Sequence, residues 1–314
     1  MLKKFIKKAY RDFTNPLKYT LSSEEELEMG YYYFKFSTKE LLAGGSQDFS
    51  FDEQGIPIIP HYMSNCNKKH YYPISIGQYG LAVLHDYFSG DEAAFKQFIN
   101  IADWFLANQT EDGYWLSYTD MSKFELEMPW TSAMTQGRAI SLLTRAYRIT
   151  GDHRYLDASI KAFSTFKQTS CPFVTKLSED KYFYQEYPGK KESNVLNGMV
   201  FCMWGLYDLF DVTKDKEVKE YFDKGINAVV DKIEEYDING WSIYDLFHKS
   251  TGSPINYCTA HYHDIHIKQL RVLGSLTNNQ ALVHKSEVWS SNATKNKLLI
   301  AYYNKIKVLV FRRK

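Results

Sequence analysis

Apolar residues recur with a helical period along most of the chain after residue 73, and this pattern restarts four times. The restarts fall near Ile74, Ser132, Val195 and Tyr262. Each run ends in a short polar turn, and successive turns lie roughly 60 residues apart. The turns are Gly90-Asp91, Gly151-Asp152, Lys214-Asp215 and Asn278-Asn279. A second amphipathic run follows each of the first three turns, and a weaker one covers 280–287, so the pattern predicts stacked helical hairpins.

A polar amide lies beside a glycine at the start of three of the first helices. The pairs are Gln78 with Gly80, Gln136 with Gly137, and Asn197 with Gly198. Glycine allows helices to approach closely, and we expect the amides to face a shared cavity. An all-α-dominated fold, an α/α toroid with inner helices ringed by outer ones, explains the period, the glycines and the lack of alternating strand patterns. We assign this toroid to residues 74–290.

The two ends of the chain have different patterns. Residues 1–15 predict an amphipathic helix, with apolar positions on one stripe and five basic residues elsewhere. Such a helix either docks on the body of the protein or lies on an anionic membrane surface. Residues 16–73 are rich in turn-forming residues and predict an irregular or β-hairpin lead-in. Residues 291–314 are expected to form a C-terminal tail.

Composition excludes several classes of protein. The formal charge of +1 over 314 residues provides no field for nucleic acid. No apolar run reaches the roughly 20 residues that a membrane-spanning helix needs. Four widely spaced cysteines and the lack of a signal sequence favour a reducing compartment. The sequence thus predicts a cytoplasmic protein, with peripheral contact at the inner membrane face as the alternative role of the first helix.

Tyrosine is unusually frequent, with 25 residues against 20 phenylalanines. The tyrosines fit either an aromatic core or a sugar-binding cleft, because the ring stacks on pyranose faces and the hydroxyl bonds to sugar hydroxyls. Phosphate-binding loops and the common hydrolase motifs are missing. His261, His263 and His266 have poor spacing for a metal. We therefore predict no metal and no cofactor, and expect these histidines to orient Tyr262 or, as imidazolium, to lower its pKa.

Four sequence runs resemble the C-terminal domain of D-glucuronyl C5-epimerases, in order and over roughly residues 55–280. They are PWTSAMTQGRAISLLTRAY from Pro129, EYP…VLNGMVFCMWGLYDL from Glu186, IYDL from Ile243 and YHDIHIKQL from Tyr262. The resemblance implies an α/α barrel. It also implies an isomerase that converts D-glucuronate to L-iduronate within a heparosan-type polysaccharide, as in glycosaminoglycan-like capsule biosynthesis.

The resemblance also implies the catalytic residues, which match position by position. Glu186 and Tyr187 take the place of the family's catalytic Glu-Tyr pair, and Tyr244 and Tyr262 match its two further tyrosines. Phe247 stands where animal members have arginine. The candidates to neutralise the substrate's charge are therefore Tyr244, His248, Arg138 and His266. Gln136 and Asn197 complete the predicted substrate-binding residues.

The chemistry requires a base and an acid on opposite faces of the sugar ring. Glu186 would remove the C5 proton and neutral Tyr262 would return one. A uronate lyase begins with the same proton abstraction, and an α/α-barrel glycoside hydrolase would pair Glu186 with Asp245 or Asp264. A glycan-binding relative without turnover is the remaining alternative. The sequence leaves the polymer itself open.

Overall fold

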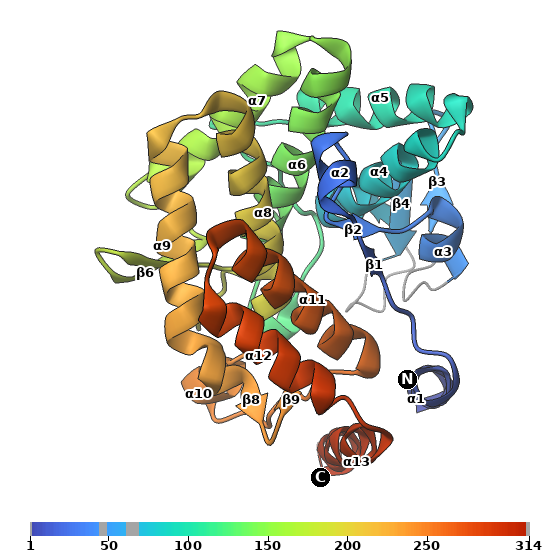
Figure 1. Ribbon diagram of the computed structural model, residues 1–314, viewed down its shortest axis with the longest axis vertical. Helices are drawn as coiled ribbons and strands as arrows, with labels where there is room; N and C mark the ends of the chain where they lie inside the picture. Colours follow the sequence, from blue (N-terminus) through green and yellow to red (C-terminus); the bar gives the residue numbers. More distant parts are fainter. Residues whose placement is uncertain (1, 44–48, 61–68, 312–314) are drawn as a thin grey trace.

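The computed structural model describes residues 2–43, 49–60 and 69–311, and most of them are helical (Figure 1). The inner helices are α4 (Pro73–Phe88), α6 (Ala133–Thr150), α8 (Leu196–Thr213) and α11 (Ala260–Thr277). They pack in chain order, α4 on α6, α6 on α8 and α8 on α11. Each packs against the helix that follows it: α5 (Glu92–Ala107), α7 (His153–Ser164), α9 (Lys216–Lys232) or α12 (Gln280–Ser291). The predicted helical hairpins are confirmed, and the last outer helix is longer than expected.

The four turns between paired helices share one local design. A residue with a positive φ angle lies just after each inner helix, and the next residue caps the N-terminus of the outer helix. The positive-φ residues are Gly90, Gly151, Lys214 and Asn278. The caps are Asp91, Asp152, Asp215 and Asn279, whose side chains accept backbone N–H groups of the following turn. Because a cap of this kind contributes about 1 kcal/mol, the polar pairs set the hairpin boundaries.

Glycine brings α6 and α8 into backbone contact. A Cβ at Gly137 would lie 2.4 Å from Cα of Cys202, and one at Gly205 would lie 2.3 Å from the carbonyl oxygen of Gly137. Neither helix could move aside without leaving its other neighbours. The sequence-based expectation that glycine permits close packing of the inner helices is confirmed at this pair.

The lead-in contains more regular structure than predicted. After α1 (Leu2–Thr14) come α2 (Glu24–Glu28) and α3 (Thr38–Ala43). The strands β1 (Thr20–Leu21) and β2 (Phe34–Lys35) pair with each other, and β3 (Ser50–Phe51), β4 (Pro57–Pro60) and β5 (Lys69–Tyr71) form an antiparallel sheet. Ser23 and Glu26 form a capping box that defines the short α2.

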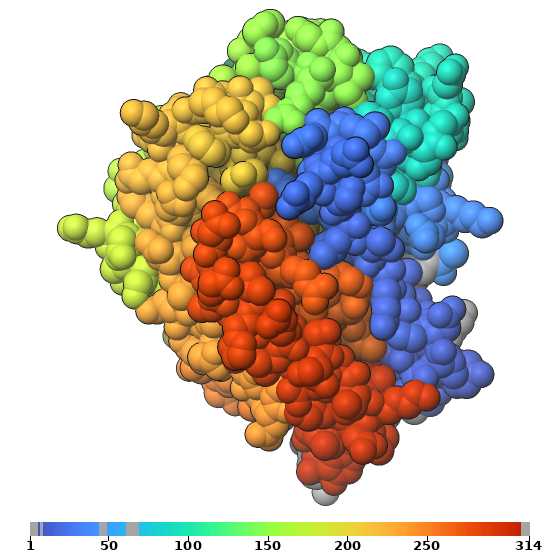
Figure 2. Space-filling model, in the orientation of Figure 1, coloured from blue at the N-terminus to red at the C-terminus, as the bar shows by residue number. Residues whose placement is uncertain are grey.

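This N-terminal segment reaches from α11 to α4. The ring of Tyr19 lies 5.2 Å from that of His261 in α11, and the ring of Tyr31 lies 4.6 Å from that of Phe88 in α4. Figure 2 shows the same arrangement on the surface, where the blue N-terminal segment lies directly beside the orange and red C-terminal helices. Residues far apart in sequence therefore share one face of the molecule.

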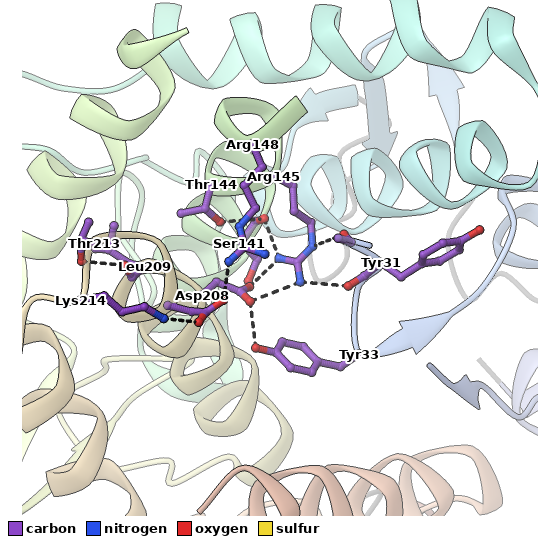
Figure 3. A network of polar contacts seen from close by, with 12 residues as sticks. Tyr31, Tyr33, Ser141, Thr144, Arg145, Arg148, Asp208, Leu209, Thr213 and Lys214 are labelled. Carbon is purple, nitrogen blue, oxygen red and sulfur yellow. Dashed lines mark hydrogen bonds and ion pairs between the residues drawn. The ribbon is translucent and has the colours of Figure 1, made fainter. Parts of the chain in front are cut away.

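A buried ion pair fixes the segment to the inner helices (Figure 3). Arg145 of α6 donates to both carboxylate oxygens of Asp208 in α8, at 2.6 and 3.2 Å. Its remaining N–H groups donate to the carbonyl oxygens of Gly30 and Tyr31, and the Tyr33 hydroxyl donates to Asp208 at 2.8 Å. The network satisfies a charge pair that burial alone would make costly.

Short elements join the hairpins. Two antiparallel hairpins are formed by β6 (Val174–Ser178) with β7 (Lys181–Tyr184) and by β8 (Asp237–Ile238) with β9 (Trp241–Ser242). The 3-10 turns are η1 (Ser122–Phe124), η2 (Thr165–Lys167) and η3 (Ile233–Tyr236), and α10 (Phe247–Thr251) is a short helix.

The predicted C-terminal tail is instead a helix, α13 (Lys295–Phe311). Leu298, Ala301 and Tyr302 lie on one side of this helix and pack against Trp241, which explains why the segment does not extend away from the body. Among the described residues, no helix is both long and apolar enough to cross a membrane. Cys171, Cys202 and Cys258 are buried, whereas Cys66 lies outside the described residues.

Candidate active site

The N-terminal ends of the inner helices meet around one group of polar side chains. The N–H of Ala133, which begins α6, donates to the carbonyl oxygen of Gln185 at 3.0 Å. The N–H of Leu196, which begins α8, donates to the carbonyl of Tyr244 at 3.3 Å. Gln269 of α11 donates to the carbonyl of Asn197 at 3.0 Å. These bonds hold the segments that carry Glu186 and Tyr244 against the starts of α6 and α8.

Glu186 follows β7 and lies directly against the first turn of α8. A Cβ at Gly198 would lie 2.4 Å from its Oε2 atom, so only glycine leaves room for this carboxyl group. The residue is 3% exposed, and within the described part of the chain Oε2 has no hydrogen-bond partner. A buried carboxyl oxygen without a donor is costly, so Glu186 Oε2 is an unusual group in this protein's interior.

Burial raises the pKa of Glu186 to about 7. The hydrogen bond from Tyr187 and the positive charges of Arg138 and Lys123 act in the opposite direction but are weaker than burial. A carboxyl group with a pKa near neutrality can accept a proton at physiological pH and release it again. The Glu186 carboxyl therefore has the protonation behaviour of a general base.

Three of the predicted tyrosines surround this carboxyl. Tyr187 is hydrogen-bonded to Glu186, and its ring stacks on Phe124 at 4.4 Å. The rings of Tyr244 and Tyr262 meet edge to face at 4.9 Å, and their hydroxyls are hydrogen-bonded. Burial, reinforced by the charge of Glu186, raises the pKa of all three above the ordinary tyrosine value. They are neutral proton donors at pH 7.

Arg138 is the buried cation of the cluster. Its guanidinium lies 3.8 Å from the centre of the Phe201 ring. Its Nε and Nη1 atoms are buried with no hydrogen-bond partner among the residues that the structure describes. Burial lowers its pKa, whereas the charge of Glu186 raises it. A guanidinium placed in this way is suited to bind a carboxylate of a ligand, which would satisfy its empty donors.

A second cation, Lys123 of η1, was not found by the sequence analysis. Its Nζ atom lies 2.8 Å from Asp245 and 4.4 Å above the Phe124 ring. It also lies 5.8 Å from the ring of Phe247, the residue that stands in place of arginine. Tyr19 and Tyr72 were missed as well, although Tyr19 helps to raise the pKa of Tyr262 and Tyr72 helps to raise that of Tyr187. No sequence motif marks any of the three.

Gln136 lies outside this cluster. Its amide donates to the carbonyl oxygen of Gly113 at 3.0 Å and accepts from the N–H of Trp115 at 3.3 Å. Both atoms of the amide are therefore used to hold the segment after α5 against α6. The expectation that this amide faces a cavity does not agree with these contacts.

His266 also points away from Glu186, toward β9. Its Nδ1 atom lies 3.1 Å from the Ser242 hydroxyl, which His263 contacts at 2.9 Å. Burial lowers the pKa of His266 to about 3 and that of His263 to about 4. The prediction that an imidazolium lowers the pKa of Tyr262 does not hold for His263 and His266, because both rings are neutral at pH 7 and the pKa of Tyr262 is raised.

The last two predicted residues occupy different positions. Asn197 lies in the first turn of α8 next to Gly198, and its Oδ1 atom is buried without a partner in the described ranges. His248 lies in α10, one residue after Phe247. Over the described residues, no group of three or more His, Cys, Asp or Glu side chains has an arrangement that could hold a metal ion.

The structure thus combines four helical hairpins with a buried group of ionisable side chains around Glu186. The model of the D-glucuronyl C5-epimerase C-terminus matches residues 109–291. The chain therefore belongs to the D-glucuronyl C5-epimerase C-terminal domain family.

Individual relatives support this assignment. The chain is 31% identical over 209 residues to a D-glucuronyl C5-epimerase of Caenorhabditis elegans, covering 61% of this chain and 34% of the worm protein. An uncharacterized protein of Methanocaldococcus jannaschii is 24% identical over 197 residues, which cover 61% of this chain and 56% of that protein. The chain thus spans a third to about half of these relatives. A polysaccharide lyase structure aligns over 92% of this chain and 46% of its own, with 11% identity and a TM-score of 0.42, too low to establish a common fold.

Proposed function

We propose that the protein epimerises uronate units of a polysaccharide at C5, converting D-glucuronate to L-iduronate. The observation that carries this proposal is the buried Glu186 carboxyl, with a pKa of about 7, beside the hydrogen-bonded pair Tyr244 and Tyr262. The family assignment supports the same reaction. The chemistry requires one group that accepts a proton and another that donates one, and this cluster contains both.

We propose the following roles. Glu186 removes the proton from C5, and Tyr262 delivers a proton to the opposite face of the resulting enolate. Tyr244, hydrogen-bonded to Tyr262, helps the proton return to that phenol after each turnover. Arg138 binds the uronate carboxylate, on which negative charge accumulates in the enolate. A preorganised donor at that position typically contributes about 10²–10³ in rate.

We infer that the four hairpins form an α/α toroid with the site at its mouth. The packing of the inner helices in chain order and the segment that reaches from α11 to α4 support this arrangement. The positive ends of several helix dipoles would then point toward the bound sugar. An anionic substrate, here a uronate-containing chain, suits such a mouth.

A glycoside hydrolase is less well supported by the same contacts. It needs a second carboxyl group in addition to Glu186. Asp245 accepts from Lys123 and Asn256, both at 2.8 Å, and Asp264 forms an ion pair with Lys268. Both candidate partners are therefore engaged within the protein.

The test is proton NMR of heparosan-type and chondroitin-type polymers incubated with the protein in D₂O. We expect deuterium at C5 of the uronate and the appearance of iduronate. Glu186→Gln and Tyr262→Phe should each lower the rate of iduronate formation by at least about 10². Tyr207→Phe, a partly buried tyrosine near the end of α8, is the matched control and should retain activity.

Two outcomes would contradict the proposal. Ultraviolet absorbance from an unsaturated uronate, with cleavage of the chain, would identify a lyase. A Glu186→Gln or Tyr262→Phe variant with more than a third of the wild-type rate would remove that residue from its assigned role.

A further inference from the structure

The helices α1 and α13 lie together at one end of the molecule and pack against the start of α11. Both are seen nearly end-on at the lower edge of Figure 1, and the ring of Phe13 lies 5.7 Å from that of Tyr302. Ala9 and Phe13 of α1 pack against Leu298 and Ala301 of α13. The two helices therefore form one layer, whose inner face is fixed to the body of the protein.

The outer face of this layer is apolar. Leu299, Ile300 and Tyr303 are 57–60% exposed, and Ile306 continues the same side of α13 one turn later. On α1, Ile6 is 56% exposed, although it belongs to the same apolar stripe as Ala9, which packs against the body of the protein. Nearly half of the exposed large apolar side chains that the structure describes lie on these two helices. Single exposed apolar residues are common, but a contiguous group marks an interaction site.

The charges of the same layer are almost all positive. The two helices contain nine lysine and arginine residues and one acid, Asp12, in a chain whose formal charge is +1. Among the described side chains, the exposed cations of the layer are Lys295 and Lys307, and they are not offset by Asp12. Its side chain is buried and accepts from the Tyr302 hydroxyl at 2.7 Å and from the N–H of Ala260 at 3.1 Å.

We propose that the outer face of α1 and α13 binds reversibly to an anionic lipid surface. The aliphatic and tyrosine side chains enter the interfacial region of the bilayer, and the surrounding lysines contact lipid phosphates. The abundance of lysine favours lipid over a protein partner, because the centres of protein interfaces are depleted in lysine.

The experiment is flotation of the full chain with vesicles of phosphatidylcholine, alone or mixed with phosphatidylglycerol. We expect binding to the mixed vesicles only, and a decrease as salt is added. The apolar variant, Ile300→Ser with Tyr303→Ser, and the charge variant, Lys295→Glu with Lys307→Glu, should both bind more weakly. The charge variant should lose at least about fivefold in partition coefficient for each cation reversed.

Matched controls come from exposed positions elsewhere. Ile160→Ser on α7 removes an equally exposed apolar side chain, and Lys216→Glu on α9 reverses an exposed lysine. Both should bind as the wild type does. Binding that ignores lipid charge, or equal losses in the variants and the controls, would overturn the proposal. A third outcome would also overturn it: the wild type binds no vesicles and is a dimer in analytical ultracentrifugation, whereas the apolar variant is a monomer. The face would then join two copies of the chain.

Discussion

The raised pKa of Glu186 makes a prediction about stability that does not depend on knowing the substrate. Glu186 binds its proton more tightly in the folded protein than in the unfolded chain, because burial penalises the carboxylate. Between pH 4.5 and about 7 the folded state therefore holds more protons than the unfolded state. The contribution of this group to the free energy of unfolding is present below pH 4.5 and is lost as pH rises through about 7.

The magnitude follows from the size of the shift. The pKa moves from 4.5 to about 7, and each pKa unit corresponds to about 1.4 kcal/mol. The ionised carboxylate should thus lower the free energy of unfolding by about 3 kcal/mol at pH 8 relative to pH 4.5. Glu186→Gln removes the ionisable group and keeps a side chain of similar shape. The free energy of unfolding of this variant should therefore not fall in this way as pH rises.

The assay is urea denaturation of both proteins at several pH values from 4.5 to 8. Buried His263 and His266 act in the opposite direction, because their lowered pKa values give stability that is lost as pH falls below about 6.5. Their contribution is common to both proteins and cancels in the difference. The wild type should lose stability relative to the variant by about 3 kcal/mol across the range. Parallel pH profiles would refute the burial of an ionisable Glu186.

Three further substitutions test other parts of the structure. Asp208→Asn leaves Arg145 buried without its anionic partner and should lower the free energy of unfolding, measured by urea denaturation, by about 3–5 kcal/mol. The control Asp211→Asn, at the exposed pair with Arg148, should lower it by less than about 1 kcal/mol. Equal losses in the two variants would contradict the assigned network. Gly198→Ala places a methyl group against Glu186 Oε2 and should reduce deuterium exchange by about 10² with the fold retained, and unchanged exchange would show that the carboxyl can move aside. Lys123→Met removes a positive charge that lowers the pKa of Glu186, so the midpoint of the pH–rate profile for deuterium exchange should shift to higher pH. An unchanged midpoint would show that the charge of Lys123 does not affect Glu186.

The hairpin architecture was predictable because its determinants are local. Each turn ends in a capping Asp or Asn, and three of the four have Gly or Asn at the preceding positive-φ position, so these signals are visible in the sequence; Lys214 in the third turn gives no such signal. The glycines of α6 and α8 were equally visible, although only the structure shows which backbone each one touches. By contrast, residues 291–314 were expected to form a tail, whereas residues 295–311 form the helix α13. Its packing depends on Trp241, more than fifty residues earlier in the chain.

The site was predictable where it follows motifs and not where it depends on packing. Glu186, Tyr187, Tyr244 and Tyr262 were found by resemblance, and the structure places them in one cluster. A polar residue on an inner helix can face either the cleft or the neighbouring hairpin, and sequence spacing does not distinguish the two. Gln136 and His266 face neighbouring elements, whereas Arg138, two residues after Gln136, keeps buried donors without a partner among the described residues.

The substitution of Phe247 for arginine leaves the cluster with cations from other elements. Arg138 reaches it from α6 and Lys123 from η1, and the charges of both lower the pKa of Glu186. Phe247 packs edge to face on Phe124 at 5.2 Å, beneath the Lys123 ammonium. Lys123 is paired with Asp245, whereas Arg138 has buried donors without a partner in the described residues, and this difference supports the proposal that Arg138 binds the substrate carboxylate. Arg138→Gln should then weaken binding of the polyuronate and slow exchange, whereas Lys123→Met should mainly shift the pH profile. This difference between the two variants separates carboxylate binding from tuning of the base.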